Sequence, residues 1–318
     1  MGNPDKIKIA VIGDIHDQWE PEDGEALKHL GVDLALFVGD FGNESVEVVS
    51  KIASLDLPKA AIMGNHDAWY TASHWGRKQS PYNHSQEDRV QQQLNLLGET
   101  HVGFGKLDFP ELNLSVVGSR PFSWGGPEWK NKIFLSDRFG VNNFEESTAR
   151  IVAAANQAAY DTIIILAHNG PTGLGDAPED TCGRDWNPLG GDHGDRDLAE
   201  AIAKIRASGK TIPLVTFGHM HHSLRHTKSR LRTAVNHSPE GTIYLNAASV
   251  PRILKSQDIT KVSMSEDLVS LRTGDRLRNF SLVSLENGVV SEISLVWVGQ
   301  DFTVALENIL TKISSFTN

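Results

Sequence analysis

The stretch IKIAVIGD, residues 7–14, sets the pattern for the N-terminal half of the chain. A short apolar run that is bounded by Gly and Asp predicts a buried β-strand ending in a polar loop. The pattern recurs in VDLALFVGD (32–40) and PKAAIMGNHD (58–67), and helical stretches separate the three runs. Strands that alternate with helices in this way indicate a parallel sheet.

The following part of the chain contains further strand signals. We expect helices within 146–160 and 195–208. The expected strands are LNLSVVGSR (112–120), DTIIILAHNG (161–170), TIPLVTFGHMHH (211–222) and GTIYLNAASV (241–250). Apart from its one expected strand, the stretch 68–145 does not continue the alternation of strands and helices, since it is rich in Trp, Gly, Pro, Asn and Ser. Its composition predicts loops.

The chain ends on a different pattern. In NFSLVSLENGVVSEISLVWV (279–298), two alternating runs flank Asn287-Gly288, a pair that suits the type I′ turn of a β-hairpin. Antiparallel strands at the end of a β/α chain indicate a mixed second sheet rather than a second domain. We therefore expect a single domain over residues 1–318. The polar stretch 255–277 shows no motif, and the sequence leaves its role open.

Charge and composition exclude several classes of partner. The 318 residues include 30 basic and 40 acidic ones, a formal net charge of −10, which argues against nucleic acid and anionic membranes as partners. Cys182 is the only cysteine, so no intramolecular disulfide can form. A strand beginning at Ile7 leaves no room for a signal peptide, and no run approaches the roughly 18 apolar residues of a membrane span. We expect a cytoplasmic protein of unknown oligomeric state.

Polar residues follow five of the expected strands, where functional loops gather in open α/β sheets. Mixed carboxylate, imidazole and amide ligands suit Mn, Fe, Zn or Ni better than Ca or Mg alone. The sequence therefore predicts a site for a pair of metal ions. The candidate ligand segments are Asp14-Ile15-His16, Asp40, Gly64-Asn65-His66-Asp67, His168 and Gly218-His219-Met220-His221.

Each segment also has a plainer interpretation. Asp14 suits a helix N-cap or turn, Asn65–Asp67 an Asx-type turn, and His168 a simple turn. Five such segments, each after an expected strand, favour the metal site over five unrelated turns. His222 is interpreted as a bystander, and Cys182 as a small buried or loop residue rather than a nucleophile.

As a set, the motifs GDIH, GDFGN, GNHD, AHNGP and GHMH resemble the calcineurin-like metallophosphoesterase superfamily over residues 13–221. GDFGNE with HNGPTGLG is similar to a subgroup known from photosynthetic lineages. The resemblance implies an α/β (α+β) fold, a four-layer αββα sandwich of two mixed β-sheets flanked by helices. It also implies two divalent or trivalent metal ions, namely Mn, Fe, Zn or Ni.

The resemblance further implies a role for each motif residue. A hydroxide bridging the metals would attack phosphorus in line, His66 would contact the phosphate and protonate the leaving oxygen, and Asp67 would orient His66. The implied ligands are Asp14, His16 and His221 for the first metal, Asn65, His168 and His219 for the second, and Asp40 as the bridge.

Departures from known branches narrow the expected chemistry. Asn43 stands where purple acid phosphatases carry a tyrosine ligand, and GDFGNES lacks the arginine of Ser/Thr protein phosphatases, which puts protein phosphatase activity in doubt. We expect a phosphomonoesterase or phosphodiesterase acting on a small phosphoester or nucleotide. The alternatives are a nuclease of the same fold, which the acidic balance disfavours, and a non-catalytic metal-binding scaffold, which the presence of His66 disfavours.

Substrate choice is expected to depend on the loops, because specificity loops sit on rigid scaffolds. Arg120 is a candidate for contact with a phosphate oxygen or for a surface ion pair. Trp124 is a candidate for stacking on a base, with packing over the sheet edge as the alternative. Arg184 and Trp186, in the loop after His168, are further candidates.

Overall fold

The computed structural model describes residues 6–261 and 274–313, and two β-sheets form its centre. Most of the stretch 255–277, whose role the sequence left open, lies outside the described residues. The first sheet has the strand order β13-β12-β11-β1-β2-β3, and β10 also pairs with β11. Its strands are β1 (Lys6–Ile12), β2 (Leu34–Phe37), β3 (Lys59–Ala61), β10 (Ile253–Lys255), β11 (Arg276–Glu286), β12 (Val289–Val298) and β13 (Val304–Lys312).

The second sheet has the order β4-β5-β6-β7-β9-β8. The neighbours from β5 to β9 run parallel, and β4 and β8 are antiparallel edge strands. In the first sheet β1 and β2 run parallel and β1 and β11 antiparallel, so both sheets are mixed, as the family resemblance implied. The C-terminal hairpin extends this first sheet, which corrects the expectation that it belongs to a second one. The strands are β4 (Lys106–Phe109), β5 (Leu114–Gly118), β6 (Thr162–Leu166), β7 (Thr211–Phe217), β8 (Val235–His237) and β9 (Ile243–Asn246).

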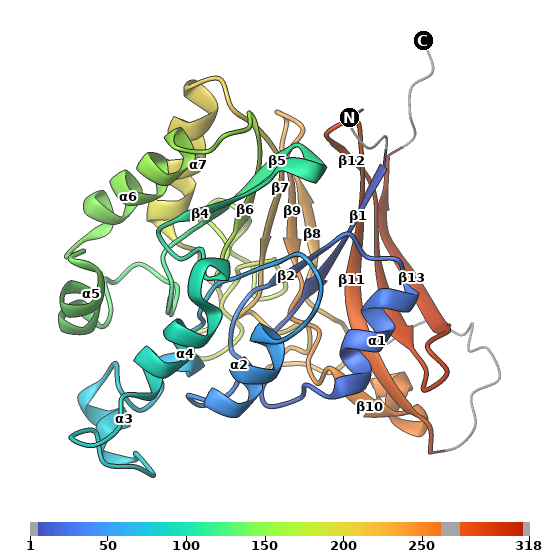
Figure 1. Ribbon diagram of the computed structural model, residues 1–318, viewed down its shortest axis with the longest axis horizontal. Coiled ribbons are helices and arrows are strands. Elements are labelled where there is room, and N and C mark those ends of the chain that lie inside the picture. Colours follow the sequence, from blue (N-terminus) through green and yellow to red (C-terminus); the bar gives the residue numbers. More distant parts are fainter. Residues whose placement is uncertain (1–5, 262–273, 314–318) are drawn as a thin grey trace.

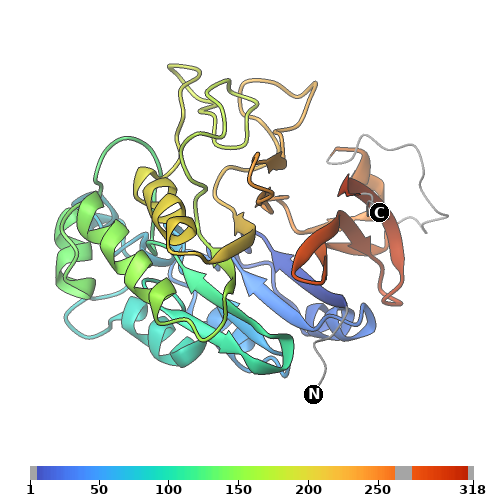
Figure 2. The ribbon, with the colours of Figure 1, turned by 90° about the horizontal axis from the view of Figure 1, so that it is seen from above.

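Helices cover the outer faces of the two sheets (Figures 1 and 2). On one side lie α1 (Pro21–His29), α2 (Val46–Ala53), α3 (His74–Lys78), α4 (Arg89–Leu97) and α5 (Lys132–Phe139), and on the other α6 (Phe144–Asn156) and α7 (Arg196–Ala207). Short 3-10 turns are η1 (His66–Ala68), η2 (Gly98–Thr100), η3 (Pro110–Leu112) and η4 (Ser256–Lys261).

The apolar run Ile9–Ile12 of β1 is buried on both faces of the sheet. Successive side chains of a strand point to opposite faces of the sheet. Ile9 and Val11 belong to the cluster between the two sheets, and Ala10 and Ile12 to the cluster under α1 and α2. A third cluster lies between the second sheet and the helices α6 and α7. These clusters separate four layers, and the predicted αββα sandwich is confirmed.

The C-terminal strands include two that the sequence analysis did not anticipate, the short β10 and the edge strand β13. β11 and β12 pair antiparallel through Asn287 and Gly288, whose φ angles of 51° and 77° are those that a type I′ turn requires. β13 then adds to the free edge of β12. The stretch 68–145, for which loops were predicted, also holds α3, α4, α5 and β4 besides its expected strand.

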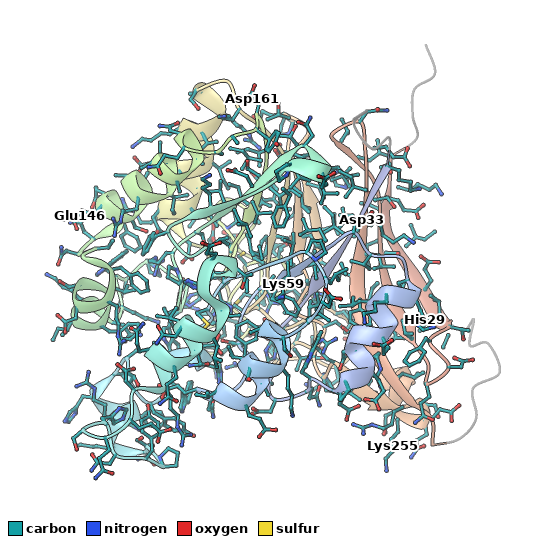
Figure 3. The ribbon with its side chains drawn as sticks, in the orientation of Figure 1. His29, Asp33, Lys59, Glu146, Asp161 and Lys255 are labelled. Atoms are coloured by element: carbon teal, nitrogen blue, oxygen red, sulfur yellow. The ribbon has the colours of Figure 1, made fainter. Side chains whose placement is uncertain are left out.

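Charged side chains such as those of Glu146, Asp161 and Lys255 lie at the periphery of the layers (Figure 3). Within the described part of the chain, every helix is too short or too polar to cross a membrane.

Candidate metal centre

The carboxyl ends of β1, β2 and β3 in one sheet meet those of β6 and β7 in the other. The loops that follow these strands bring every sequence-predicted ligand to one place. Three groups of side chains have ligand atoms that all lie within 4.8 Å of one another. They are Asp14, His16 and His221; His16, Asp40 and His66; and Asp40, His168 and His219.

The first group has nitrogen and oxygen acceptors facing each other. His221 Nε2 lies 3.1 Å from Asp14 Oδ2 and 3.2 Å from His16 Nε2. Two imidazole lone pairs at this separation repel each other unless a proton or a cation lies between them. Burial lowers the pKa of His221, but the hydrogen bond and charge of Asp14 outweigh burial and raise it. The donor set therefore fits a cation.

The group of Asp40, His168 and His219 is fixed by a backbone contact. His168 Nδ1 lies 2.8 Å from the carbonyl oxygen of Val38, and since a carbonyl only accepts, Nδ1 carries the hydrogen. His168 Nε2 then faces Asn65 Oδ1 at 2.9 Å and Asp40 Oδ1 at 3.4 Å. Outer hydrogen bonds of this kind commonly fix the tautomer of metal-binding histidines. These converging atoms fit a second cation.

Asp40 lies between the side chain of His16 on one side and that of His168 on the other. Its carboxylate is 3.4 Å from His168 Nε2 and 4.0 Å from His16 Nε2, and it is almost fully buried. Its Oδ1 also accepts the backbone N–H of His66 at 2.8 Å. This central placement is compatible with a bridging carboxylate, the role that the sequence resemblance implies.

The ligand loops hold a strained backbone. His16, Asp40 and His219 have φ angles of 44°, 52° and 66°, in the left-handed region that residues other than Gly rarely adopt. Such a conformation costs about 1–3 kcal/mol per residue and clusters at functional sites. Packing around the loops must hold all three residues in place.

Two glycines allow the ligand loops to approach each other. A Cβ atom at Gly64 would lie 2.2 Å from Asp40 Oδ1, and one at Gly218 would lie 2.1 Å from Asp14 Oδ1. Real Cβ atoms essentially never come this close to another heavy atom. Any larger residue at Gly64 of GNHD or Gly218 of GHMH would therefore clash with a candidate ligand.

Burial and neighbouring charge set the ionisation of the ligands. Burial opposes ionisation of Asp14, yet the hydrogen bond from His221 and the surrounding imidazoles hold its pKa far below the usual range. Burial also holds the pKa of His219 well below that of a free histidine. An anionic carboxylate and a neutral imidazole are the forms that bind metals.

The structure corrects the expected role of Asp67. Its buried carboxylate accepts the backbone N–H groups of Asp40, Phe41 and Gly64 at 3.0, 2.8 and 2.7 Å, so it holds two ligand loops together rather than orienting His66. Burial and the nearby charge of Asp40 raise its pKa well above that of a free carboxyl. The partner of the His66 ring is Asn43, whose Oδ1 lies 2.6 Å from Nδ1.

His66 is also held by aromatic packing. Its ring stacks on Trp69 with centroids 4.5 Å apart, and Trp69 stacks on Trp124 at 5.5 Å. Burial lowers the pKa of His66, although the charges of Asp40 and Asp14 work in the opposite direction. Sequence reasoning missed Trp69, and its place directly after GNHDA was the available signal.

Glu44 anchors the segment that carries Trp69. It is fully buried and accepts the backbone N–H groups of Tyr70 and Thr71, at 2.8 and 2.7 Å, and the hydroxyl of Tyr82. Burial raises the pKa of the Glu44 carboxyl. This residue, which the sequence analysis did not single out, connects the GDFGNE loop to the aromatic segment.

Arg120 is neither a substrate contact nor a surface ion pair, the two roles considered from the sequence. It is buried, and its guanidinium donates to Asp197 Oδ2 at 2.9 Å and to Asp195 Oδ1 at 2.7 Å. Burial alone would lower the pKa of Arg120, but the two carboxylates raise it. Arg120 thus joins the end of β5 to the start of α7.

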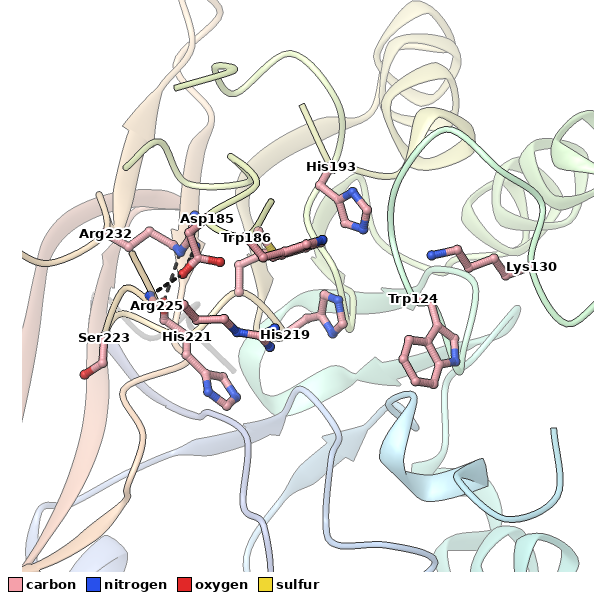
Figure 4. Close-up of a pocket in the computed structure, with 11 residues that line it drawn as sticks. Trp124, Lys130, Asp185, Trp186, His193, His219, His221, Ser223, Arg225 and Arg232 are labelled. Carbon is pink, nitrogen blue, oxygen red and sulfur yellow. Dashed lines mark hydrogen bonds and ion pairs between the residues drawn. The ribbon is translucent and has the colours of Figure 1, made fainter. Parts of the chain in front are cut away.

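A cavity of about 330 Å³ lies beside the ligand loops, and some of the other substrate candidates line it. Trp124 and Trp186 line this cavity together with His219 and His221 (Figure 4). Arg184 is not among the lining residues; its backbone N–H and carbonyl bond to Gly191 and Gly190 in a loop turn. His222 is buried, with Nε2 2.9 Å from the Asn246 carbonyl oxygen, and Cys182 is buried too.

Comparison with known proteins finds a family model, described as calcineurin-like phosphoesterase, that matches residues 7–223. One solved structure is similar at 11% identity and a TM-score of 0.50, over 91% of this chain and 98% of its own. A dimetal phosphatase from Danio rerio shares 11% identity, with a TM-score of 0.45 over 96% of this chain and 99% of its own.

A purple acid phosphatase from yellow lupin (Lupinus luteus) seeds shares 13% identity, with a TM-score of 0.40 over 96% of this chain and 53% of its own. None of the curated proteins matches this chain. At these identities a structural likeness concerns the fold alone.

Proposed function

The chain belongs to the calcineurin-like phosphoesterase family, and from this premise we propose that it is a dimetal phosphohydrolase acting on a small phosphoester or nucleotide. The observation that carries the proposal is the convergence of seven candidate ligands, with the ring of His66 beside them. A cavity of about 330 Å³ adjoins them, which is a size typical of small-ligand sites.

We assign the ligands as the sequence resemblance implies. When bound, two such ions stabilise charge on a phosphoryl group and make water nucleophilic near neutral pH. The donor set of nitrogen and oxygen atoms suits Mn, Fe, Zn or Ni. The ligands would be Asp14, His16 and His221 for one ion, Asn65, His168 and His219 for the other, and Asp40 for both.

His66 is assigned to the substrate rather than to a metal. With Asn43 Oδ1 as the acceptor, Nδ1 carries the hydrogen, and Nε2 is the atom that can hold and deliver a second proton. The stack on Trp69 fixes the plane of the ring. His66 would protonate the leaving oxygen as a general acid, a contribution of roughly 10²–10⁴ in rate.

We propose a small-molecule substrate and a cytoplasmic setting. A net charge of −10 disfavours the non-specific phosphate contacts on which a nuclease depends. For this reason the nuclease alternative ranks second.

The test compares hydrolysis of p-nitrophenyl phosphate and bis(p-nitrophenyl) phosphate by metal-stripped protein reloaded with Mn²⁺. We expect Mn-dependent turnover that falls by roughly a hundredfold or more in His66→Ala. His29→Ala is the matched control, because His29 is exposed on α1. Wild-type protein that binds two ions per chain and yet hydrolyses neither ester would contradict the proposal, and the ratio of the two rates decides between monoester and diester.

A further inference from the structure

The cavity beside the metal centre has a distinctive composition. Its wall comes from the loops after β5, β6 and β7, which are far apart in the sequence. In the view of Figure 4, His219 lies between two tryptophans. The lining residues are Trp124, Lys130, Asp185, Trp186, His193, His219, Met220, His221, Ser223, Arg225 and Arg232.

Two indole rings supply flat apolar surface to the cavity. One face of Trp124 is covered by Trp69, at a centroid distance of 5.5 Å, so its other face and edge are what remain for the cavity. Trp186 meets His193 edge to face, with centroids 4.9 Å apart. Aromatic side chains of this kind are platforms on which nucleobases stack.

Three cationic side chains line the cavity, and one of them, Arg232, is paired with Asp185. The ammonium group of Lys130 points into it in Figure 4, and the guanidinium carbon of Arg225 lies 5.3 Å from the ring centroid of Trp186. Among the residues that the structure describes, no carboxylate lies within ion-pair distance of either cation. Asp185 also lines the cavity, but its carboxylate faces Arg232 at 3.4 Å. In a chain of net charge −10, such a place favours an anionic ligand.

The wall is tied to the ligand loops by Arg232. Its Nη1 donates to the carbonyl oxygens of Asp180 and Gly183 at 2.8 and 2.6 Å, and its Nε donates to that of His221 at 3.0 Å. The loops after β6 and β7 consequently extend side by side (Figure 2). The loop bearing Trp186 is therefore fastened to a candidate metal ligand, which is the pre-organisation that a binding site needs.

We propose that this cavity binds the remainder of a nucleoside diphosphate whose terminal phosphate lies at the metal centre. The inference rests on the proposed function for the position of that phosphate. The base stacks on Trp124, and Lys130 and Arg225 bind the second phosphate. Hydrolysis adds water across the terminal P–O bond, with the leaving oxygen protonated from His66, and gives a nucleoside monophosphate and inorganic phosphate.

The first test is direct binding. Mn-loaded protein is titrated calorimetrically with the methylene-bridged analogue of adenosine diphosphate, which cannot be hydrolysed between its phosphates. We expect Trp124→Leu to weaken binding roughly tenfold, and Trp124→Phe, which keeps a ring, to restore most of it. The matched control is Trp75→Leu, since Trp75 is 59% exposed and its ring meets that of Trp69 edge to face.

The second test separates the base from the second phosphate by kinetics. Adenosine diphosphate, ribose 5-diphosphate and ribose 5-phosphate are compared as substrates. Trp124→Leu should raise KM roughly tenfold for adenosine diphosphate and leave that for the two ribose phosphates unchanged. Arg225→Gln and Lys130→Gln should raise KM for both diphosphates but not for ribose 5-phosphate, with little change in kcat. Arg230→Gln is the matched control, because Arg230 is exposed and pairs with Glu179.

The outcomes distinguish this inference from the proposed function. If p-nitrophenyl phosphate is hydrolysed but KM for adenosine diphosphate is the same in wild type and Trp124→Leu, the cavity assignment is wrong and the hydrolase stands. If no ester is hydrolysed while the analogue still binds in a Trp124-dependent manner, the nucleotide site is upheld and the hydrolase fails. Absence of analogue binding to the metal-loaded protein overturns the nucleotide site.

Discussion

The ligand loops and the cavity wall are adjacent, yet they are built differently. The ligand loops, which carry Asp14, Asp40 and His219, are held by backbone hydrogen bonds and by contacts so close that Gly64 and Gly218 have no room for a Cβ. The cavity wall is held by stacked rings and by long side chains such as Arg232. A single added atom in the ligand loops should therefore lower metal binding and activity sharply. Changes in the shape of the wall's side chains should alter activity and stability by smaller, graded amounts.

The sharpest test of the ligand loops is Asp40→Ala. Removing the carboxylate placed between both ligand groups should lower bound metal from two ions to one or none per chain. Activity should fall roughly a thousandfold or more, since the charge stabilisation lost amounts to several kcal/mol. Metal content by elemental analysis, measured alongside turnover, checks this. Two ions retained in the variant would contradict a bridging role.

Arg120→Met tests the support beneath the wall. Removing the guanidinium leaves Asp195 and Asp197 buried without their cation, and breaking a buried pair costs about 3–5 kcal/mol of unfolding free energy. Urea denaturation measures the loss. Arg230→Met, at an exposed ion pair, should change the same quantity by less than about 1 kcal/mol. Equal effects in the two variants would show that the buried pair does not support the fold.

Gly64→Ala adds one methyl group to the ligand loops. Its Cβ would lie 2.2 Å from Asp40 Oδ1 and 2.5 Å from His168 Cε1, so both candidate ligands must move. We expect metal affinity to fall by about a hundredfold, at the upper end of what displaced supports cause. The control Gly105→Ala places its Cβ 3.6 Å or more from its neighbours and should leave metal titrations unchanged.

Asn43→Ala removes the acceptor from His66 Nδ1 without touching a proposed ligand. We expect kcat to fall roughly tenfold with KM and metal content nearly constant, because only part of the general-acid contribution depends on ring orientation. Asn43→Asp restores an acceptor and adds negative charge, which raises the pKa of His66. Its alkaline activity limb should therefore move to higher pH. A change in KM alone would argue against a positioning role for Asn43.

Trp69→Leu connects the two regions and should have the smallest effect. Loss of a stacked pair corresponds to about 0.5–1.5 kcal/mol, or roughly two- to twelvefold, and we expect kcat to fall by the lower part of this range. Burial lowers the pKa of His66, so opening one face of the ring to water should raise it. The protonated acid then persists to higher pH, and the alkaline limb of the pH–rate profile should shift upward. A downward shift would contradict burial as the cause.

The ligand loops and the cavity wall also differ in how much of each could be predicted from the sequence. The candidate ligands follow apolar runs directly, so a local pattern identified them. The parallel arrangement of β1, β2 and β3 in one sheet, and of β6 and β7 in the other, placed them at adjoining edges. The buried strands were predictable for the same reason, since a strand buried on both faces has a largely apolar sequence. The four layers, by contrast, were expected from the family resemblance.

What the sequence could not reveal depends on contacts between distant residues. Asp67 is adjacent to His66 in sequence, but its carboxylate faces the backbone of another loop. Arg120 reaches partners 75 and 77 positions away, and nothing near it in the chain distinguishes a buried guanidinium from an exposed one. Asn43 and Trp69 gain meaning only once folding brings both against the same imidazole.

The meeting of two sheets at the metal centre has a thermodynamic consequence. Under the proposed assignment, one ion draws Asp14 and His16 from the first sheet and His221 from the second, and the other draws Asn65 from the first and His168 from the second. Each ion would then cross-link the two sheets of the sandwich. Ligands that bind only the folded state add to its stability in proportion to the logarithm of their concentration. Occupancy of the centre would thus set the resistance of the whole sandwich to heat, and a chelator would act on the fold as well as on the chemistry.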